Sequence, residues 1–370
     1  MRSGVVRAVL LGLAVGLVGG PCGDVSAQTV RSGVLPTTLR WGPQRPDLLR
    51  FNRVEALSIG ARAQLRPSSA LGPLSVTATG RLGVADLEPN GRLDVTRETL
   101  RHRLTVSAYN ELTALDETAR HLGPANSAMA AVFGRDDGDY FYRSGAGVEW
   151  TPPTAARRAF RVGVHAEYHR AAVVEHSVSL PRAFDDTWIF RPNVVAVDGW
   201  EYGVSALVSP WWGTDPLLPR GGVSAEVRAG TGTADFVRAS VGGILFLPLV
   251  PNLRVSLEAR GGTTWGSPTP QRLWYVGGAE TVRGYAPRTM AGTTFALARA
   301  EIQRTMVFGG LVVFSDLGWA GDRRDVTLAT GLASVGAGLA LVDGLVRVDV
   351  ARRLREPRGT RADFYLDALR

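Results

Sequence analysis

Three charged residues in the C-terminal half, one arginine and two carboxylates, have the types and spacing to form buried ion pairs with one another. Arg283 lies in a glycine-rich stretch, and Glu301 and Asp316 follow in two segments of alternating polar and apolar residues. With a period of two, both carboxylates fall on the polar faces of these segments. If the apolar faces contact lipid, the carboxylates point into a water-filled interior, where a loop folded inward could pair its arginine with them.

A second group has the spacing of metal ligands. His165, Glu167 and His169 alternate along one segment, so one face of a strand could offer two imidazoles and a carboxylate to a metal. Arg161 shares that face, and we therefore favour a hydrated interior wall and predict no metal site.

Acidic residues also cluster around Gly138. Asp136, Asp137 and Asp139 could suggest calcium, but the terminal glutamate of a calcium loop is missing at the expected offset. A solvated extracellular loop is the favoured interpretation.

Signals for catalysis are weak. The sequence contains neither a Gly-x-Ser-x-Gly elbow nor a phosphate-binding loop. Cys22 is the only cysteine, and we expect it to leave with a signal peptide, so neither a thiol nucleophile nor a cysteine zinc site is expected. A serine, a histidine and an acid could still converge, which leaves an outer-membrane lipid hydrolase open. We predict that the protein is not an enzyme and has no cofactor.

The elements that must position these residues are β-strands. From Arg50 onward, segments of about ten alternating residues are separated by turns, which is typical of a transmembrane barrel. Strands are predicted at 54–65, 74–84, 93–113, 140–151, 159–174, 195–208, 223–229, 236–247, 253–265, 295–307, 311–320, 335–342, 345–353 and 362–369. Two more could lie within the long third segment or near residues 30–47. The predicted fold is all-β, a transmembrane antiparallel β-barrel of 14 to 16 strands with an inward-folded extracellular loop.

Connection lengths and aromatic residues support this fold. Short connections at 88–91, 152–156, 251–252, 309–310 and 343–344 alternate with long ones at 114–138, 176–193 and 266–292, although 210–220 is longer than its place predicts. Aromatic residues gather near predicted strand ends, as in interfacial girdles: Tyr140, Phe141, Tyr142, Trp200, Tyr202, Trp211, Trp212, Trp265, Trp274 and Tyr275. A soluble β-sandwich with surface aromatics is the alternative.

The N-terminal region carries targeting signals. Arg2 and Arg7 precede an apolar run, and Val25-Ser26-Ala27 has the small residues of a cleavage site. We predict a signal peptide at 1–27, an irregular periplasmic lead-in at 28–47 and an outer-membrane β-barrel at 48–370.

Charge limits the classes of partner. The formal net charge is +8 and the 42 basic residues are all arginine, but they are scattered along alternating segments without a basic run. Nucleic acid is therefore not a predicted partner, and arginines that line a barrel or contact anionic lipid are favoured. No apolar run after residue 20 approaches the ~20 residues of a spanning helix, so any membrane span must be β.

Several motifs together resemble one family. They are Val276-Gly277-Gly278, then Val282-Arg283-Gly284-Tyr285, then Glu301, then Phe314-Ser315-Asp316-Leu317-Gly318, with Phe51-Asn52-Arg53-Val54-Glu55 at the start of the strand pattern. This set resembles the bacterial surface-antigen barrel superfamily, which includes the BamA and TamA outer-membrane assembly factors and the translocators of two-partner secretion. The chain resembles a barrel-only member, because few residues precede the predicted strands where relatives carry periplasmic modules. Its end, Ala368-Leu369-Arg370, also lacks the terminal aromatic residue common in the family.

The resemblance implies a structural lock. Arg283 would meet Asp316 with Glu301 close by, while Gly284 permits the turn and Tyr285 packs against the wall. The loop glycines Gly277 and Gly278 and the wall glycine Gly318 belong to the same motifs.

The implied function is insertion or translocation of protein or lipid at the bacterial outer membrane. Expected partners are outer-membrane lipid and a secreted or membrane protein substrate, and a separate periplasmic partner stays open. The alternative is a passive porin or structural barrel.

Overall fold

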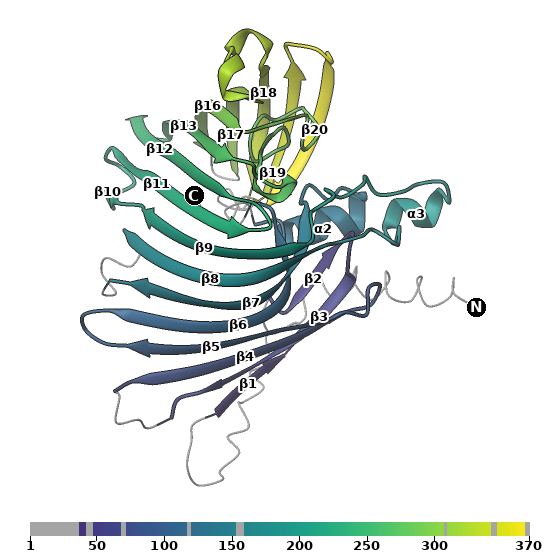
Figure 1. Cartoon of the computed structure of the whole chain (residues 1–370). Helices are drawn as coiled ribbons and strands as arrows, with labels where there is room; N and C mark the ends of the chain where they lie inside the picture. Colours follow the sequence, from purple (N-terminus) through teal and green to yellow (C-terminus); the bar gives the residue numbers. More distant parts are fainter. Residues whose placement is uncertain are drawn as a thin grey trace. The chain divides into compact units, whose positions relative to one another are not determined.

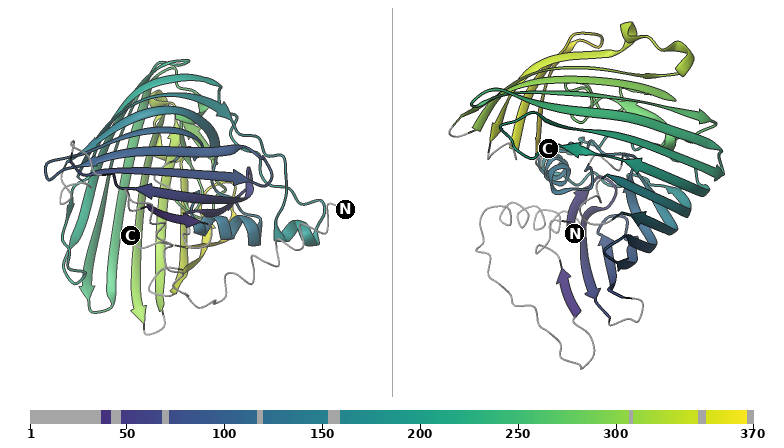
Figure 2. Two further views of the ribbon diagram at one scale, coloured as in Figure 1. Left: turned by 90° about the horizontal axis from the view of Figure 1, so that it is seen from below. Right: turned by 90° about the vertical axis from the view of Figure 1, so that its left-hand side faces the viewer.

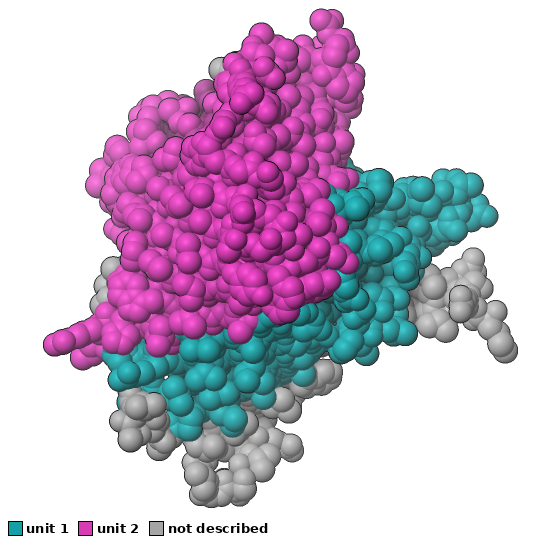
Figure 3. All heavy atoms as spheres, in the orientation of Figure 1, with its two compact units in different colours: residues 1–99, 105–145, 170–195 teal, residues 100–104, 146–169, 196–370 magenta. Residues whose placement is uncertain are grey.

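The computed structural model describes residues 37–41, 47–67, 72–116, 120–152, 159–306, 309–341 and 346–366. The predicted signal peptide, the turn at 343–344 and the C-terminal residues 368–370 lie outside the described residues. The chain divides into two compact units, coloured separately in Figure 3. Unit 1 comprises residues 1–99, 105–145 and 170–195, and unit 2 comprises residues 100–104, 146–169 and 196–370.

Unit 1 begins with an interrupted strand. β1 (Thr37–Trp41) and β2 (Leu49–Asn52) both pair antiparallel with one edge of β3 (Ala56–Leu65), β1 with one half and β2 with the other. β4 (Leu74–Gly83) pairs with the opposite edge of β3, and β5 (Pro89–Glu98) pairs with β4. Residues 37–41 are therefore a strand and not part of an irregular lead-in.

The long third segment is two strands. β5 ends at Glu98, and β6 (Arg103–Ala114) begins after a bend at which Leu100 is 96% exposed. The alternation runs on through a bend that contains no glycine or proline, so the pattern alone did not separate the two strands. The sequence allowed two additional strands. One is the strand that begins with β1, and the other arises because the third segment is divided into β5 and β6.

Two helices occur in connections that were predicted to be loops. α2 (Pro124–Phe133) begins with a proline and ends at Gly134, whose φ of 64° caps the helix, and α3 is Leu180–Phe184. One face of α2 packs in a cluster with Phe51 and Phe190. None of the helices in the described ranges is long and apolar enough to cross a bilayer.

Unit 2 is a run of long antiparallel strands, each paired with the next, which lie side by side in Figures 1 and 2. They are β8 (Phe160–Ala171), β9 (Gly199–Val208), β11 (Arg220–Gly232), β12 (Phe236–Val250), β13 (Leu253–Gly266), β16 (Thr294–Met306), β17 (Gly309–Gly321), β18 (Leu332–Leu341), β19 (Val346–Arg353) and β20 (Gly359–Leu366). β10 (Trp211–Trp212) extends the β9 edge along β11, and β7 (Tyr140–Thr151) has residues in both units.

The all-β prediction is confirmed. With β1–β2 and β9–β10 taken as one interrupted strand each, and the short strands β14 and β15 set apart, the described residues form sixteen sheet strands. Their closure into a barrel stays a prediction.

The two faces of the unit 2 strands have opposite character. Ile302 and Val313 lie opposite each other on β16 and β17 and are 49% and 60% exposed. Asp316 and Ser334, opposite each other on β17 and β18, are 1% and 0% exposed. Large apolar side chains are thus outside and charged ones inside, which reverses the usual order of a soluble protein and suits a lipid-facing surface.

The aromatic residues divide into three groups, because Trp274 and Tyr275 are half-buried in β14 of the long loop and do not belong to a girdle. Those near the strand ends of unit 2 are exposed, as a girdle requires: Trp200, Tyr202, Trp211, Trp212 and Trp265. Tyr140, Phe141 and Tyr142 are buried, so assigning them to a girdle was wrong. Tyr140 turns inward because its hydroxyl donates a hydrogen bond to Asp136 Oδ1 over 2.7 Å.

Candidate functional site

The candidate site is formed by the long connection between β13 and β16 in unit 2. Within it, the 3₁₀ turn η3 (Pro270–Arg272) leads to β14 (Trp274–Val276), which pairs antiparallel with β15 (Met290–Gly292). The two arms of the loop are thereby joined, and residues 277–289 form its tip.

The tip, together with Val276 just before it, packs closely against the strands. Val276, Val282 and Tyr285 have no exposed surface and form a cluster with Leu297 of β16, Ala320 of β17 and Leu332 of β18. A Cβ atom on Gly318 would lie 2.5 Å from Val282 Cγ2 and 2.8 Å from Val276 Cγ1. Gly318 therefore allows the loop to approach β17 closely.

Arg283 lies at the centre of the tip and is completely buried. Its Nε and Nη2 donate to the two oxygens of Asp316 over 2.7 and 2.6 Å, and its backbone N–H donates to Oδ2 over 3.1 Å. Its Nη1 donates to Glu301 Oε1 over 2.5 Å and to Asp349 Oδ2 over 3.2 Å. The guanidinium carbon is 3.5 Å from the ring centroid of Phe314. One loop residue thus contacts carboxylates of β16, β17 and β19.

Two further arginines balance these carboxylates. Arg347 reaches Glu301 Oε2 and Asp349 Oδ2, each over 3.1 Å, and Arg299 lies 3.5 Å from Asp316 Oδ1. Three guanidinium groups and three carboxylates therefore alternate in a buried network. Removing any one member leaves an uncompensated buried charge, which is strongly destabilising.

Gly284 and Tyr285 fix the residues after Arg283. Gly284 has a φ of 87°, and its N–H donates to Asp363 Oδ2 of β20 over 3.2 Å. A Cβ at this position would lie 2.9 Å from the Cβ of Ala351. The Tyr285 hydroxyl lies 2.9 Å from the carbonyl oxygen of Arg355. The earlier loop glycines, Gly277 and Gly278, also have positive φ, at 121° and 99°.

The residues that the sequence assigned to the structural lock lie in this one cluster, and the sequence reasoning missed others. Arg347, Asp349 and Asp363 were not identified. Arg347 and Asp349 do alternate on a predicted strand, but the pattern does not say which loop meets that strand. Arg299 alternates with Glu301 on a predicted strand, and the pattern does not show that it reaches Asp316.

The same loop makes a second buried contact. Arg272, 3% exposed, donates from Nε to Glu201 Oε2 over 2.8 Å and from Nη2 to Glu201 Oε1 over 2.5 Å, and its Nη2 lies 3.3 Å from Glu167 Oε1. Glu167 and Glu201 are direct cross-strand partners on β8 and β9. Like charges so placed destabilise a sheet, and the guanidinium group offsets this repulsion.

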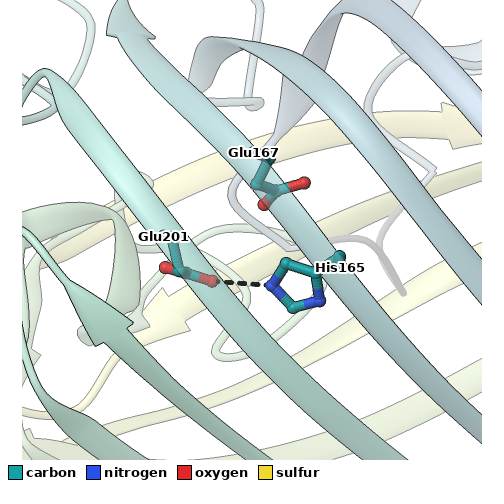
Figure 4. Close-up of side chains that lie close together, drawn as sticks. All are labelled: His165, Glu167 and Glu201. Carbon is teal, nitrogen blue, oxygen red and sulfur yellow. Dashed lines mark hydrogen bonds and ion pairs between the residues drawn. The ribbon is translucent and has the colours of Figure 1, made fainter.

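Two histidines complete this second contact. His165 Nε2 lies 3.1 Å from Glu201 Oε1, and His169 Nε2 lies 2.8 Å from Glu167 Oε1. Figure 4 shows His165 on β8 directed towards Glu201 on β9. Ligand atoms of His165, Glu167 and Glu201 lie within 4.8 Å of one another, a spacing that suits a cation, and the guanidinium group of Arg272 supplies the positive charge. The expected hydrated wall was wrong here, because the loop covers these residues.

The acidic cluster around Gly138 is also buried, and a solvated loop was the wrong expectation. Asp136 and Asp139 in unit 1 are 3% and 5% exposed because Arg53 lies between them. Arg53 donates from its backbone N–H to Asp136 Oδ2 over 2.8 Å and from Nη2 to Asp139 Oδ1 over 2.7 Å.

Comparison with known proteins identifies the fold. No protein-family model and no curated protein sequence matches the chain. The crystal structure of BamA from Haemophilus ducreyi lacking POTRA domains 1–3 matches with a TM-score of 0.57 at 12% sequence identity, covering 92% of this chain and 73% of that one. The fold of the chain is thus similar to that of BamA. The resemblance drawn from the motifs is thereby confirmed at the level of the fold.

Two weaker matches are to CdiB chains. CdiB from Escherichia coli matches with a TM-score of 0.46 at 12% identity, over 89% of this chain and 62% of that one. CdiB from Acinetobacter baumannii matches with a TM-score of 0.40 at 13% identity, over 90% of this chain and 59% of that one. The chain thus spans about three-fifths of each CdiB chain.

Proposed function

We propose that the protein is a barrel of the bacterial outer membrane that takes part in inserting or translocating protein or lipid, with its long loop as an inward plug. The fold shared with BamA and the exposed apolar face of the unit 2 strands support this proposal. The proposed partners are outer-membrane lipid, a secreted or membrane protein substrate and a separate periplasmic protein.

The proposed plug role of the loop rests on one observation. Arg283 has no exposed surface, and a single loop residue contacts carboxylates of three strands, Glu301, Asp316 and Asp349. Such a residue holds the loop against the polar face of the sheet. Charge-assisted hydrogen bonds in a buried site are among the stronger polar contacts, and their geometry is specific.

Arg272 gives the loop a second attachment. Its contacts with Glu167 and Glu201 lie on β8 and β9, whereas Arg283 contacts β16, β17 and β19. Breaking the Arg283 contacts releases the tip, and breaking both sets of contacts frees the whole loop. A substrate can favour the open loop only by the difference between its affinities for the two states.

Conductance in planar bilayers tests this role. Replacement Arg283→Ala is expected to raise conductance and to make the loop sensitive to protease, because the tip loses its ion pairs. Arg254→Ala is the matched control, since Arg254 lies near the start of the strand β13 and donates to Gln303 of the neighbouring strand β16. Unchanged conductance together with unchanged protease sensitivity in Arg283→Ala would remove the plug role.

The same recordings separate the proposal from its alternative. A passive porin would give steady open channels in the unmodified protein and would purify without a partner protein. A translocating barrel is expected to be mostly closed at rest and to be recovered with a substrate or periplasmic protein after gentle cross-linking.

A further inference from the structure

Unit 1 contains a polar cavity that the proposed function does not use. It has a volume of about 570 Å³ and lies on the polar face of the strands β1 and β3 to β5. Five arginines contribute to its lining, whereas only two carboxylates do: Arg40, Arg50, Arg62, Arg81 and Arg92, with Asp94 and Glu111.

Three of the five arginines have carboxylate partners. Arg50 forms paired hydrogen bonds of 2.7 and 2.8 Å with Glu55. Arg92 contacts Asp94 over 2.9 Å and Glu111 over 3.1 Å. Arg62 lies 2.7 Å from Asp47, a carboxylate that is half exposed.

The other two arginines form no direct ion pair with a carboxylate of the described residues, although the charges of Glu55 and Asp47 act on Arg81 from further away. Arg81 donates from Nη2 to the carbonyl oxygen of Asp47, and its buried Nη1 has no hydrogen-bond partner. Arg40 makes no hydrogen bond or ion pair with any residue that the structure describes, and it lies directly opposite Arg62 on the neighbouring strand. Like charges in that position destabilise a sheet, so this arrangement favours an anion between the strands.

We infer that this cavity binds a phosphate-type oxyanion. A guanidinium group matches the oxygens of a phosphate in geometry as well as charge, and Arg40 and Arg81 both line the cavity without a direct ion pair to a carboxylate. Neutral donors share the lining, namely Gln64, Thr77 and Thr79. They suit the remaining oxygens of the anion, and a predominantly polar lining suits a headgroup or a free anion better than an acyl chain.

The phosphate could come from solution or from a lipid headgroup, and one titration distinguishes these sources. The whole chain in nonionic detergent is titrated calorimetrically with inorganic phosphate at low, constant ionic strength, with chloride as the comparison anion. Saturable binding of phosphate, but not of chloride, is the expected result. If phosphatidic acid added to the micelles competes and phosphatidylcholine does not, the site takes the lipid headgroup. Without competition, it takes the free anion.

Matched variants show where the anion binds. Arg81→Gln and Arg40→Gln should each weaken phosphate binding by about tenfold, because each removes one guanidinium contact. Arg97→Gln removes the same charge from an exposed position of β5 outside the cavity and should leave binding unchanged. Arg81→Lys, which retains the charge without the fork geometry, should lie in between.

Three results would overturn the inference. They are the absence of saturable phosphate binding, full affinity in both Arg81→Gln and Arg40→Gln, and an equal loss in Arg97→Gln, which would indicate nonspecific attraction to a basic protein. Melting curves by circular dichroism establish that each variant is folded, and the two separate positions mean that one unstable variant does not decide the result.

Discussion

Each compact unit contains one large arginine side chain with no exposed surface, Arg53 in unit 1 and Arg283 in unit 2. Both donate a backbone N–H and guanidinium N–H groups to carboxylates. Both also lie against an aromatic ring, with the guanidinium carbon 5.5 Å from the centroid of Tyr140 for Arg53 and 3.5 Å from that of Phe314 for Arg283. The two sites thus use the same chemistry.

They differ in the elements that they join. Arg53 lies in the turn between β2 and β3, and its partners Asp136 and Asn193 lie in connecting segments, with Asp139 just before β7. Arg283 lies in a loop, but its partners are residues of long strands. Contacts among connections stabilise one end of a sheet, whereas a contact between a loop and a strand face sets the position of that loop. Arg53 is therefore expected to stabilise the fold. Arg283 is expected to determine whether the loop blocks the proposed pore.

The largest effect is expected from Asp316→Ala. It leaves the buried Arg283 without its paired acceptor, and breaking a buried ion pair in this way costs about 3–5 kcal/mol. Urea titration of the protein in lipid vesicles should show this loss in the free energy of unfolding, together with higher conductance. A variant as stable and as closed as the unmodified protein would contradict the assignment.

Asp139→Ala should distinguish the role of Arg53 from that of Arg283. The cost is smaller, about 2–3 kcal/mol, because Asp139 accepts one N–H group of Arg53, whereas Asp316 accepts three of Arg283. The same titration should show this destabilisation, while the conductance stays at the closed level. If the conductance rises as far as in Asp316→Ala, the two sites do not differ in role.

Arg272→Gln tests the second attachment of the loop. It removes the guanidinium from between Glu167 and Glu201, but His165 and His169 still contact the two carboxylates, so we expect a cost of about 1–3 kcal/mol. Conductance should rise less than in Arg283→Ala. A double variant should exceed the sum of the single increases, because each single variant keeps one attachment, which restricts the movement of the loop. Simple additivity in the conductance would show that the two attachments act separately.

The smallest expected effect is the pH dependence of the free energy of unfolding that His176 in unit 1 produces. Burial lowers the pKa of His176 from 6.5 to about 4, and the carboxylate of Asp136 opposes that shift in part. Its ring lies between Phe51 and Phe190, at centroid distances of 6.5 and 6.0 Å. The neutral form therefore stabilises the fold, since protonation above pH 4 occurs only in the unfolded chain.

The free energy of unfolding should accordingly fall as the pH drops from 6.5 towards 4, by on the order of 1–2 kcal/mol because the ring is not fully buried. His176→Phe should flatten this part of the curve. An identical slope in the variant would assign the pH dependence to other groups.

Much of the fold follows from alternation along the chain. The period of two located most of the strands and placed Glu301 and Asp316 on polar faces, because a pleated strand alternates its side chains regardless of its neighbours. It did not separate β5 from β6, because the bend at residues 99–102 lacks the usual turn residues. β1 was hidden among prolines that flank it.

The contacts between distant segments could not be predicted in this way. Arg272 meets Glu201 across 71 residues and Glu167 across 105, and nothing local in the sequence signals either pairing. The acidic cluster around Gly138 was assigned to solvent for the same reason, since its partner Arg53 precedes Asp136 by 83 residues. Local patterns report which face a residue occupies, whereas the tertiary fold decides what covers that face.

The rate at which a buried thiol is labelled tests the loop contact most directly. Val282 is completely buried beside Gly318, and Cys22 is the only cysteine in the chain, so Val282→Cys with Cys22→Ser gives a single reporter. With Arg283 intact, and also in the Arg254→Ala background, a charged methanethiosulfonate should not react with it. With Arg283→Ala the thiol should become reactive as the tip leaves the strands. Equal protection in the presence and absence of Arg283 would show that this arginine does not hold the loop.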